Sequence, residues 1–228
     1  MRGRLVLRRG RCAAGRAGRA WRLALLFTLF VRAAAARADE AAAASDGTAS
    51  WKGRASLSAY LFPDGSDYLV AVGAADHRAL HLEARYGYED RRTVSFFAGW
   101  NLALGGPVEV EVVPMLGAAV GRRNGLIPAL ELTLSWGPLQ YYLEAEFLID
   151  LASLSSSYYY GWSELSGAPV AWMRAGIVIQ RTHLVNTRRE VTPGLLIGFS
   201  AWKLDLTGYW FEPGGNGQYV VVLVGVRF

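Results

Sequence analysis

Residues 139–150, LQYYLEAEFLID, alternate between apolar and polar side chains. One face carries Leu139, Tyr141, Leu143, Ala145, Phe147 and Ile149, and the other carries Gln140, Tyr142, Glu144, Glu146 and Asp150. A period of two predicts a β-strand with one apolar and one polar face. The same alternation recurs in 80–88, 126–136 and 202–211, and no helical period competes with it from residue 39 onward. The fold class is therefore predicted to be all-β.

Twelve candidate strands follow from this pattern. Their predicted ranges are 54–62, 67–75, 80–89, 93–102, 107–121, 124–136, 139–150, 158–166, 170–181, 189–200, 202–211 and 218–228. Alternation is poor in 67–75 and 158–166. Pro114, Pro128 and Pro193 fall inside predicted strands, where proline removes a ladder donor, so we expect either bulges or different boundaries there.

The predicted connections fall into two sets. Connections at 76–79, 103–106, 137–138, 167–169 and 201 are tight, whereas those at 151–157, 182–188 and 212–217 are longer and more polar. Tight turns on one rim and longer loops on the other are typical of an outer-membrane barrel. A soluble β-sandwich, which buries its apolar face against a second sheet, would account for the alternation alone.

Outward-facing aromatic residues are predicted at both rims. The tight-turn rim would carry Trp100, Trp136, Tyr141, Phe199, Trp202 and Phe228, and the loop rim Tyr86, Tyr88, Phe147 and Trp210. Two aromatic belts around an apolar band are typical of a membrane-spanning barrel, and a sandwich does not account for them.

The first 38 residues have the pattern of a cleavable signal peptide. An Arg-rich segment runs to Arg22, an apolar core covers 23–31, and Ala36-Arg37-Ala38 is a cleavage sequence. The apolar core is too short for a membrane-spanning helix. Residues 39–53 are predicted to be a flexible periplasmic tail, and 54–228 the transmembrane β-barrel.

Charge and cysteine content exclude several functions. Ten of the 24 basic residues precede residue 39, which leaves 14 basic against 19 acidic side chains, a net charge of −5. This removes the main support for binding nucleic acid. The only cysteine, Cys12, lies in the leader, so the predicted mature chain has no disulfide and no thiolate metal site.

The last strand points to a class of protein. Residues 218–228, QYVVVLVGVRF, end on an aromatic residue, and Val220, Val222, Val224 and Val226 share the face of Phe228. This strand resembles the C-terminal strand of Gram-negative outer-membrane β-barrel proteins. The resemblance implies that these five residues are the assembly signal read by the barrel-assembly machinery. It also implies a location in the cell outer membrane, among lipid and lipopolysaccharide. Because bacterial single-chain barrels have even strand numbers, we predict one antiparallel up-and-down barrel of twelve strands, with ten as the alternative.

The polar faces of the strands would line the interior of such a barrel. Candidate pore-lining residues are Glu83, Arg85, Glu109, Glu111, Glu131, Glu144, Glu146, Asp150, Arg174, Lys203, Asp205 and Arg227. Acids on three consecutive strands predict an acidic wall that needs water, a cation or arginines from across the interior. Acidic linings favour cations, so one interpretation is a narrow passive channel for small neutral or cationic solutes. The other is a closed structural or surface-interaction barrel filled by its own salt bridges.

Enzymatic chemistry has little support in the sequence. A barrel lipid hydrolase would need a serine and a histidine together on the membrane face, and none of His77, His81 and His183 falls there beside a serine. No set of metal ligands with characteristic spacing and no phosphate-binding glycine loop occurs. We therefore expect no enzyme activity, no cofactor and no metal.

Overall fold

The computed structural model describes residues 50–185 and 187–228, so the predicted signal peptide, Cys12 and most of the tail lie outside the described residues. The strands are β1 (Lys52–Leu61), β2 (Tyr68–His77), β3 (Leu80–Tyr86), β4 (Thr93–Trp100), β5 (Leu102–Leu104), β6 (Glu109–Gly121), β7 (Gly125–Trp136), β8 (Leu139–Asp150), β9 (Tyr158–Val170), β10 (Met173–Leu184), β11 (Glu190–Ala201), β12 (Leu204–Phe211) and β13 (Tyr219–Arg227). A 3-10 turn, η1 (Leu154–Ser156), precedes β9.

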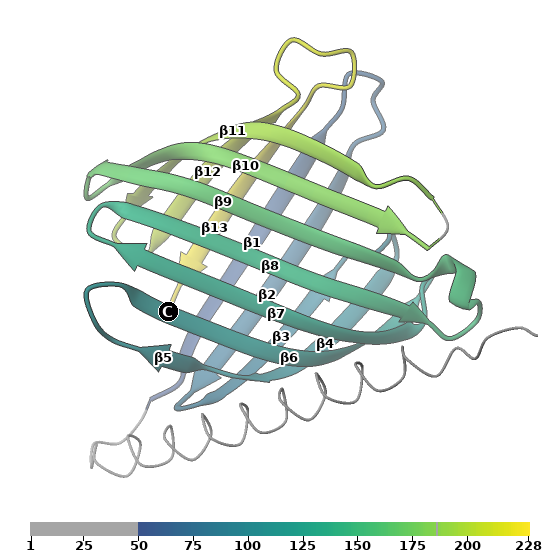
Figure 1. Ribbon diagram of the computed structural model, residues 1–228, viewed down its shortest axis with the longest axis horizontal. Coiled ribbons are helices and arrows are strands. Elements are labelled where there is room, and N and C mark those ends of the chain that lie inside the picture. The colour runs from purple at the N-terminus through teal and green to yellow at the C-terminus, as the bar shows by residue number, and fades with distance from the viewer. Residues whose placement is uncertain (1–49, 186) are drawn as a thin grey trace, which may run out of the picture. The chain divides into compact units, whose positions relative to one another are not determined.

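The strands form a closed antiparallel barrel (Figure 1). Each strand pairs with its neighbour along the chain, and β1 closes the ring by pairing with β13, from Arg54 opposite Arg227 to Leu61 opposite Val220. Closure leaves no unpaired sheet edge, as a bilayer requires. The predicted all-β, up-and-down architecture is confirmed.

β4 and β5 are two parts of one strand, so the barrel has twelve strands. Both pair with β6 in one continuous register, with Gly99 opposite Met115 and Leu102 opposite Val112. The break lies opposite Pro114, which has no N–H to donate to the ladder. The predicted strand count of twelve is confirmed, and the alternative of ten is wrong.

The other two prolines also lie inside strands without a register shift beside them. β7 and β8 keep one register on both sides of Pro128, since Leu126 faces Ile149 and Ala129 faces Glu146. Pro193 faces Ile179 on β10, and the β11–β12 ladder begins one residue later at Gly194. The predicted strand boundaries were therefore close, and the prolines interrupt ladders instead of forming bulges. The one recorded β9–β10 irregularity lies between Met173 and Ala175.

Connections differ between the two ends of the barrel. We call the end with residues 78–79, 105–108, 137–138, 171–172 and 202–203 the turn end, and the end with 62–67, 87–92, 122–124, 151–157, 185–189 and 212–218 the loop end. The predicted asymmetry is present, but three turns were misplaced, of which 103–106 is observed at 105–108. β9 continues to Val170, so its turn is 171–172 and not 167–169, and β12 begins at Leu204, so its turn is 202–203 and not residue 201.

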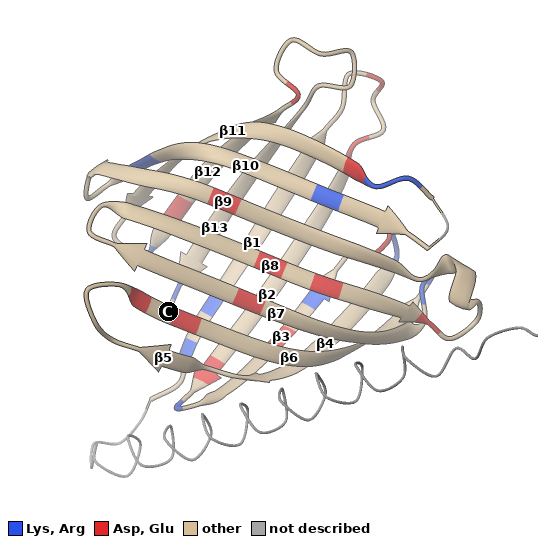
Figure 2. Ribbon diagram, in the orientation of Figure 1, with Lys and Arg blue, Asp and Glu red and all other residues tan. Residues whose placement is uncertain are grey.

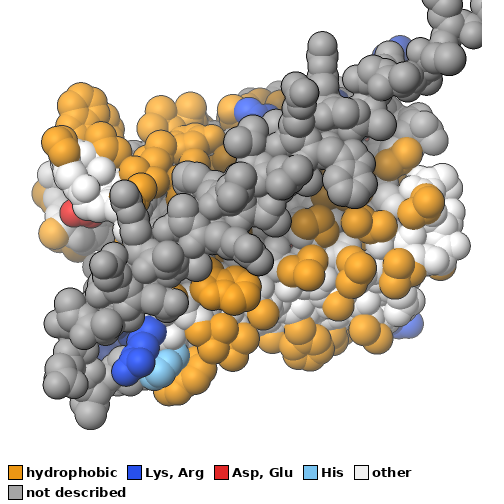
Figure 3. Space-filling model, turned by 60° about the horizontal axis from the view of Figure 1, so that its bottom comes forward, with side chains coloured by type: hydrophobic (Ala, Val, Ile, Leu, Met, Phe, Trp, Pro, Cys, Tyr) orange, Lys and Arg blue, Asp and Glu red, His pale blue; other side chains and the backbone are white. Residues whose placement is uncertain are grey.

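Hydrophobic side chains cover much of the visible outer surface in Figure 3, and many large apolar residues of the strands are exposed. Exposed residues include Trp100, Trp136, Phe199, Trp202 and Phe228 toward the turn end and Tyr86, Phe147 and Trp210 toward the loop end. Trp51 and Trp172 extend the turn-end set. Tyr88 is an exception: it was predicted to face outward, but it points into the barrel.

The barrel interior, here called the lumen, contains two kinds of packing. An apolar cluster of buried residues consists of Tyr60, Val70, Trp162, Val178, Leu196, Tyr209, Phe211 and Val221, from β1, β2 and β9 to β13. The buried ionisable side chains come mainly from β3 and β8, and acidic residues of β6, β7 and β8 lie on neighbouring strands (Figure 2). Among the described residues, no helix is long and apolar enough to cross a membrane.

Candidate functional site

β3 and β8 place ionisable side chains on facing walls of the lumen. Strand alternation turns His81, Glu83 and Arg85 inward from β3, while Leu80, Leu82 and Tyr86 face outward and are exposed. On β8 the same alternation buries Glu144 and Glu146. β4, β6 and β7 lie between these two strands on one side of the ring, so contacts between them cross the lumen.

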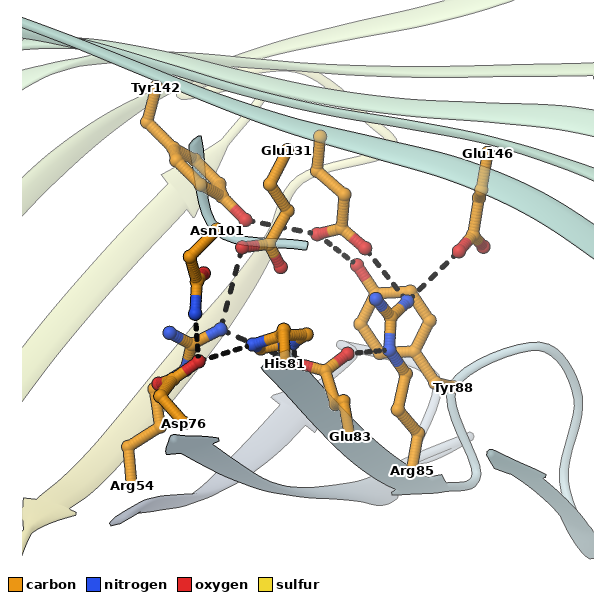
Figure 4. Close-up of polar contacts among 11 residues, drawn as sticks. Arg54, Asp76, His81, Glu83, Arg85, Tyr88, Asn101, Glu131, Tyr142 and Glu146 are labelled. Atoms are coloured by element: carbon orange, nitrogen blue, oxygen red, sulfur yellow. Dashed lines mark hydrogen bonds and ion pairs between the residues drawn. The ribbon is translucent and has the colours of Figure 1, made fainter. Parts of the chain in front are cut away.

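Arg85 makes the central contacts across the lumen, from β3 to β8. Its Nη1 donates to Glu144 Oε1 at 2.8 Å and to Glu146 Oε2 at 2.9 Å, and its Nε donates to Glu83 on its own strand (Figure 4). Its guanidinium also lies 4.4 Å from the ring centroid of Tyr88. We call Glu83, Arg85, Tyr88, Glu144 and Glu146 the Arg85 cluster. One buried guanidinium bound to three carboxylates is a strong local contact, and it leaves an excess of negative charge.

Tyr88 belongs to this cluster because the backbone turns at Gly87. Gly87 has φ +74°, and a Cβ there would lie 2.7 Å from the carbonyl oxygen of Leu69. Only glycine fits such a position without strain. The turn ends the alternation of β3 and brings the Tyr88 hydroxyl within 2.8 Å of Glu144 Oε2, to which it donates. The Tyr88 ring also contacts Tyr160 of β9, with ring centroids 5.6 Å apart.

Arg54 makes a second crossing toward the turn end. From β1 it contacts Glu131 of β7 at 3.4 Å and Glu83 of β3 at 3.5 Å. Glu131 lies directly opposite Glu144 in the β7–β8 ladder. Like charges in that position repel, so arginines that reach across the lumen stabilise this acidic wall. The acidic wall was predicted; the two arginines that cross to it are Arg54 and Arg85.

A smaller polar chain lies beside Arg54. His81 Nδ1 and Asn101 Nδ2 each lie 2.7 Å from Asp76 Oδ1. His81 Nε2 has no hydrogen-bond partner and lies 3.8 Å from Glu83 Oε2. A carboxylate that accepts from Nδ1 fixes the ring orientation. His183 lies outside this chain of contacts, and its Nε2 is 3.2 Å from the backbone oxygen of Thr187.

The remaining residues predicted to face the lumen lie outside the Arg85 cluster, several of them nearer to one end of the barrel. Arg174 binds Glu164 at 2.6 Å, Asp150 binds Arg123 at 3.3 Å near the loop end, and Arg227 binds Asp205 at 3.0 Å near the turn end. Glu109 and Glu111 are exposed at the turn-end part of β6. That these residues line a conducting pore stays a prediction.

The predicted position of Lys203 within a strand was wrong. It was predicted to face inward from a strand beginning at residue 202, but it lies in the turn that precedes β12, beside Trp202. The strand starts two residues later than predicted because Trp202 has φ +55°, a turn conformation. Val220, Val222, Val224, Val226 and Phe228 do lie on the outer side of the last strand and its end, and their role as an assembly signal stays a prediction.

Several residues of the lumen were missed by the sequence analysis. Asp76, Asn101 and Tyr88 lie next to strand ends, where alternation gives little guidance, and the positive φ of Gly87 decides the direction of Tyr88. Tyr60, Trp162 and Tyr209 were not recognised as an apolar filling, since a period of two does not distinguish aromatic residues inside a barrel from those outside. Glycine followed by an aromatic residue at a strand end was the available signal for Tyr88.

Glu89 is the other missed residue. It lies in the loop 87–92 with 7% of its surface exposed, and neither carboxylate oxygen has a hydrogen-bond partner among the described residues. Burial raises the pKa of the Glu89 carboxyl above its usual value. A buried acid without a hydrogen bond of normal geometry is uncommon in folded proteins.

Comparisons with known proteins give likenesses of structure and none of sequence. No family model matches the chain, and no curated protein matches it. Among solved structures, OccK7 (OpdD) of Pseudomonas aeruginosa superposes with TM-score 0.44 and 10% identity, covering 81% of this chain and 66% of that one. OccK5 (OpdH) of the same organism gives 0.42 and 9%, covering 75% and 62%, and OccAB4 of Acinetobacter baumannii gives 0.43 and 8%, covering 75% and 56%. The chain thus spans less than two thirds of the length of each of these proteins.

Proposed function

We propose that this protein is a narrow passive channel of a Gram-negative outer membrane, which conducts small neutral or cationic solutes. The observation that carries the proposal is the construction of its lumen. Acidic side chains from β3, β7 and β8 outnumber the arginines that bind them, and these ion pairs join strands on facing walls of the lumen. Acidic linings of this kind attract cations and repel anions.

The membrane location is supported by the outer surface. A closed barrel with an apolar outside and aromatic residues toward both ends matches the demands of a bilayer. Such a location makes membrane lipid and lipopolysaccharide its surroundings. Recognition of the last strand by the barrel-assembly machinery belongs to the same proposal, because Phe228 and the valines before it are exposed on one face.

A second candidate function is a closed barrel whose loops are the working part. It is favoured by the apolar cluster, in which Trp162 packs edge-on against Tyr209 and Phe211 at centroid distances of 5.1 and 5.4 Å. These side chains fill part of the lumen, as happens in small barrels. The two candidates differ in one property, ion flow through the folded protein.

The test is reversal potential in a salt gradient across a planar bilayer, with protein extracted from membranes. We expect small conductance steps with a preference for cations. Glu131→Gln should reduce that preference, because it removes an acid from the lumen wall, whereas Glu190→Gln, an exposed acid at the loop end of β11, should leave it unchanged. Silence from folded protein would contradict the channel and favour the closed barrel.

A further inference from the structure

A cavity of about 350 Å³ lies on the loop-end side of the Arg85 cluster. Its wall is dominated by tyrosines from three strands and one loop, namely Tyr60 of β1, Tyr68 of β2, Tyr88 of the loop 87–92, and Tyr158 and Tyr160 of β9. We call it the tyrosine cavity. Its size falls within the range of small-molecule sites, and its mixture of apolar rings and a few polar groups is typical of them.

Most charged groups that line the tyrosine cavity already have partners. Arg123 binds Asp90 at 3.3 Å, and Glu146 accepts from Arg85 at 2.9 Å. Arg91 is exposed, donates to the backbone oxygen of Ser66, and lies 5.4 Å from the ring centroid of Tyr68. Glu89 is the exception, since both of its carboxylate oxygens are without a hydrogen bond.

Glu89 gives the cavity an uncompensated acid. Its side chain is more than nine-tenths buried, and it lines the cavity together with Glu146. The Ser95 hydroxyl, fully buried on β4, lies beside the Glu89 carboxyl and likewise makes no hydrogen bond of normal geometry within the described part of the chain. Burial favours the protonated form of Glu89, and a cation bound beside it would stabilise the ionised form, so this part of the cavity is suited to a cation.

The tyrosine rings select the kind of cation. The faces of aromatic rings attract positive charge, and two of the cavity tyrosines already hold cations of the chain, Arg85 over Tyr88 and Arg91 over Tyr68. A bare metal ion would need several oxygen or nitrogen ligands, and the described residues contain no group of three or more such side chains arranged to hold one. An organic cation meets both features, because its charge is spread over an apolar surface.

We propose that the tyrosine cavity binds a small organic ammonium ion, with its charge toward Glu89 and its alkyl groups against Tyr158 and Tyr160. The position of the cavity, between the loop end and the Arg85 cluster, would make it the first binding site for a solute entering from outside. If the protein is the proposed channel, this site would define the class of solute that it conducts, and this part of the inference rests on the proposed function. Binding itself does not require conduction.

Isothermal titration of detergent-solubilised protein tests the proposal, with choline as the cation and 3,3-dimethyl-1-butanol as its neutral isostere. We expect choline to bind and the isostere to bind far more weakly. Glu89→Gln should weaken choline binding by about tenfold or more, since it removes a charged partner. Tyr160→Leu should also weaken it, and Glu190→Gln serves as the matched control.

Each outcome decides the question. Equal binding of choline and its isostere would replace the cation site with an apolar pocket and overturn the proposal, as would the absence of binding by protein shown to be folded from its heat-modifiable migration. Calcium binding without choline binding would also overturn it. Conductance of the same preparation separates the two proposals: conduction without choline binding contradicts only this inference, and choline binding without conduction contradicts only the channel.

Discussion

Gly87 shows how one residue can decide the content of the lumen. Strict alternation along β3 would place Tyr88 outside the barrel, in the aromatic belt. The left-handed conformation of Gly87 ends that alternation, and Tyr88 becomes a hydrogen-bond donor to Glu144 and a neighbour of Arg85. The sequence contains the signal, a glycine before an aromatic residue at a strand end, but only the backbone angle establishes the direction.

Gly87→Ala should destabilise the folded barrel, and Gly65→Ala provides a matched control. Both glycines have φ +74°, but a Cβ at Gly87 would lie 2.7 Å from Leu69 O, whereas Gly65 has no atom within 4 Å. We expect a loss of about 1 kcal/mol for Gly65→Ala, from backbone strain alone, and about 2–3 kcal/mol for Gly87→Ala. Urea unfolding in detergent micelles, followed by circular dichroism, measures both. Equal losses would show that the contact with Leu69 is unimportant.

The strands were predictable because a half-apolar environment imposes a period of two. β8 was predicted at its observed bounds, 139–150, where alternation is strict. Alternation is poorest in β2 and β9, yet both formed, since barrel closure supplies each with two hydrogen-bonded neighbours. Strand ends were less predictable. Lys203 was misplaced because Trp202 adopts a turn conformation that no periodicity reveals.

Contacts inside the lumen were beyond sequence reasoning for a different reason. Alternation predicted Glu131, Glu144 and Glu146 on one wall, together with Glu109 and Glu111, balanced by water, a cation or arginines from across the lumen. Which arginines reach them depends on the order of strands around the ring and on the tilt and register of each pair. Arg54 and Glu131 are 77 residues apart in the chain and meet only in the closed barrel. Alternation gives the face of a residue but not its partner.

Lysine on the outer face should reveal the depth of the bilayer along β1. Leu57 and Leu61 both face outward with similar exposure, 49% and 44%, but Leu57 lies mid-strand and Leu61 at the loop end. We expect Leu57→Lys to cost about 2–4 kcal/mol and Leu61→Lys about 0–1 kcal/mol, because a charge near the interface keeps its hydration. Unfolding in lipid vesicles measures the difference. The same small cost at both positions would argue against a membrane-spanning β1.

At the scale of the whole molecule, the barrel separates two tasks. The apolar outer surface and the closed ladder suit the proposed membrane location, and the lumen contains an acidic wall, two arginines that cross to it and an apolar cluster. Two residues of the Arg85 cluster, Tyr88 and Glu146, also line the tyrosine cavity. We therefore expect the polar side chains of facing strands to set the width of the lumen.

Single-channel conductance of a variant without the Arg85 crossing tests this claim most directly. The triple replacement Arg85→Ala, Glu144→Ala and Glu146→Ala removes the cation together with both acids of the opposite wall, and the remaining carboxylate, Glu83, keeps its contact with Arg54 at 3.5 Å. Arg122→Ala, at an exposed loop-end arginine, is the control. We expect larger conductance steps for the folded triple variant than for the unmodified protein and the control. Steps of unchanged size, or none from any of the three folded proteins, would contradict it.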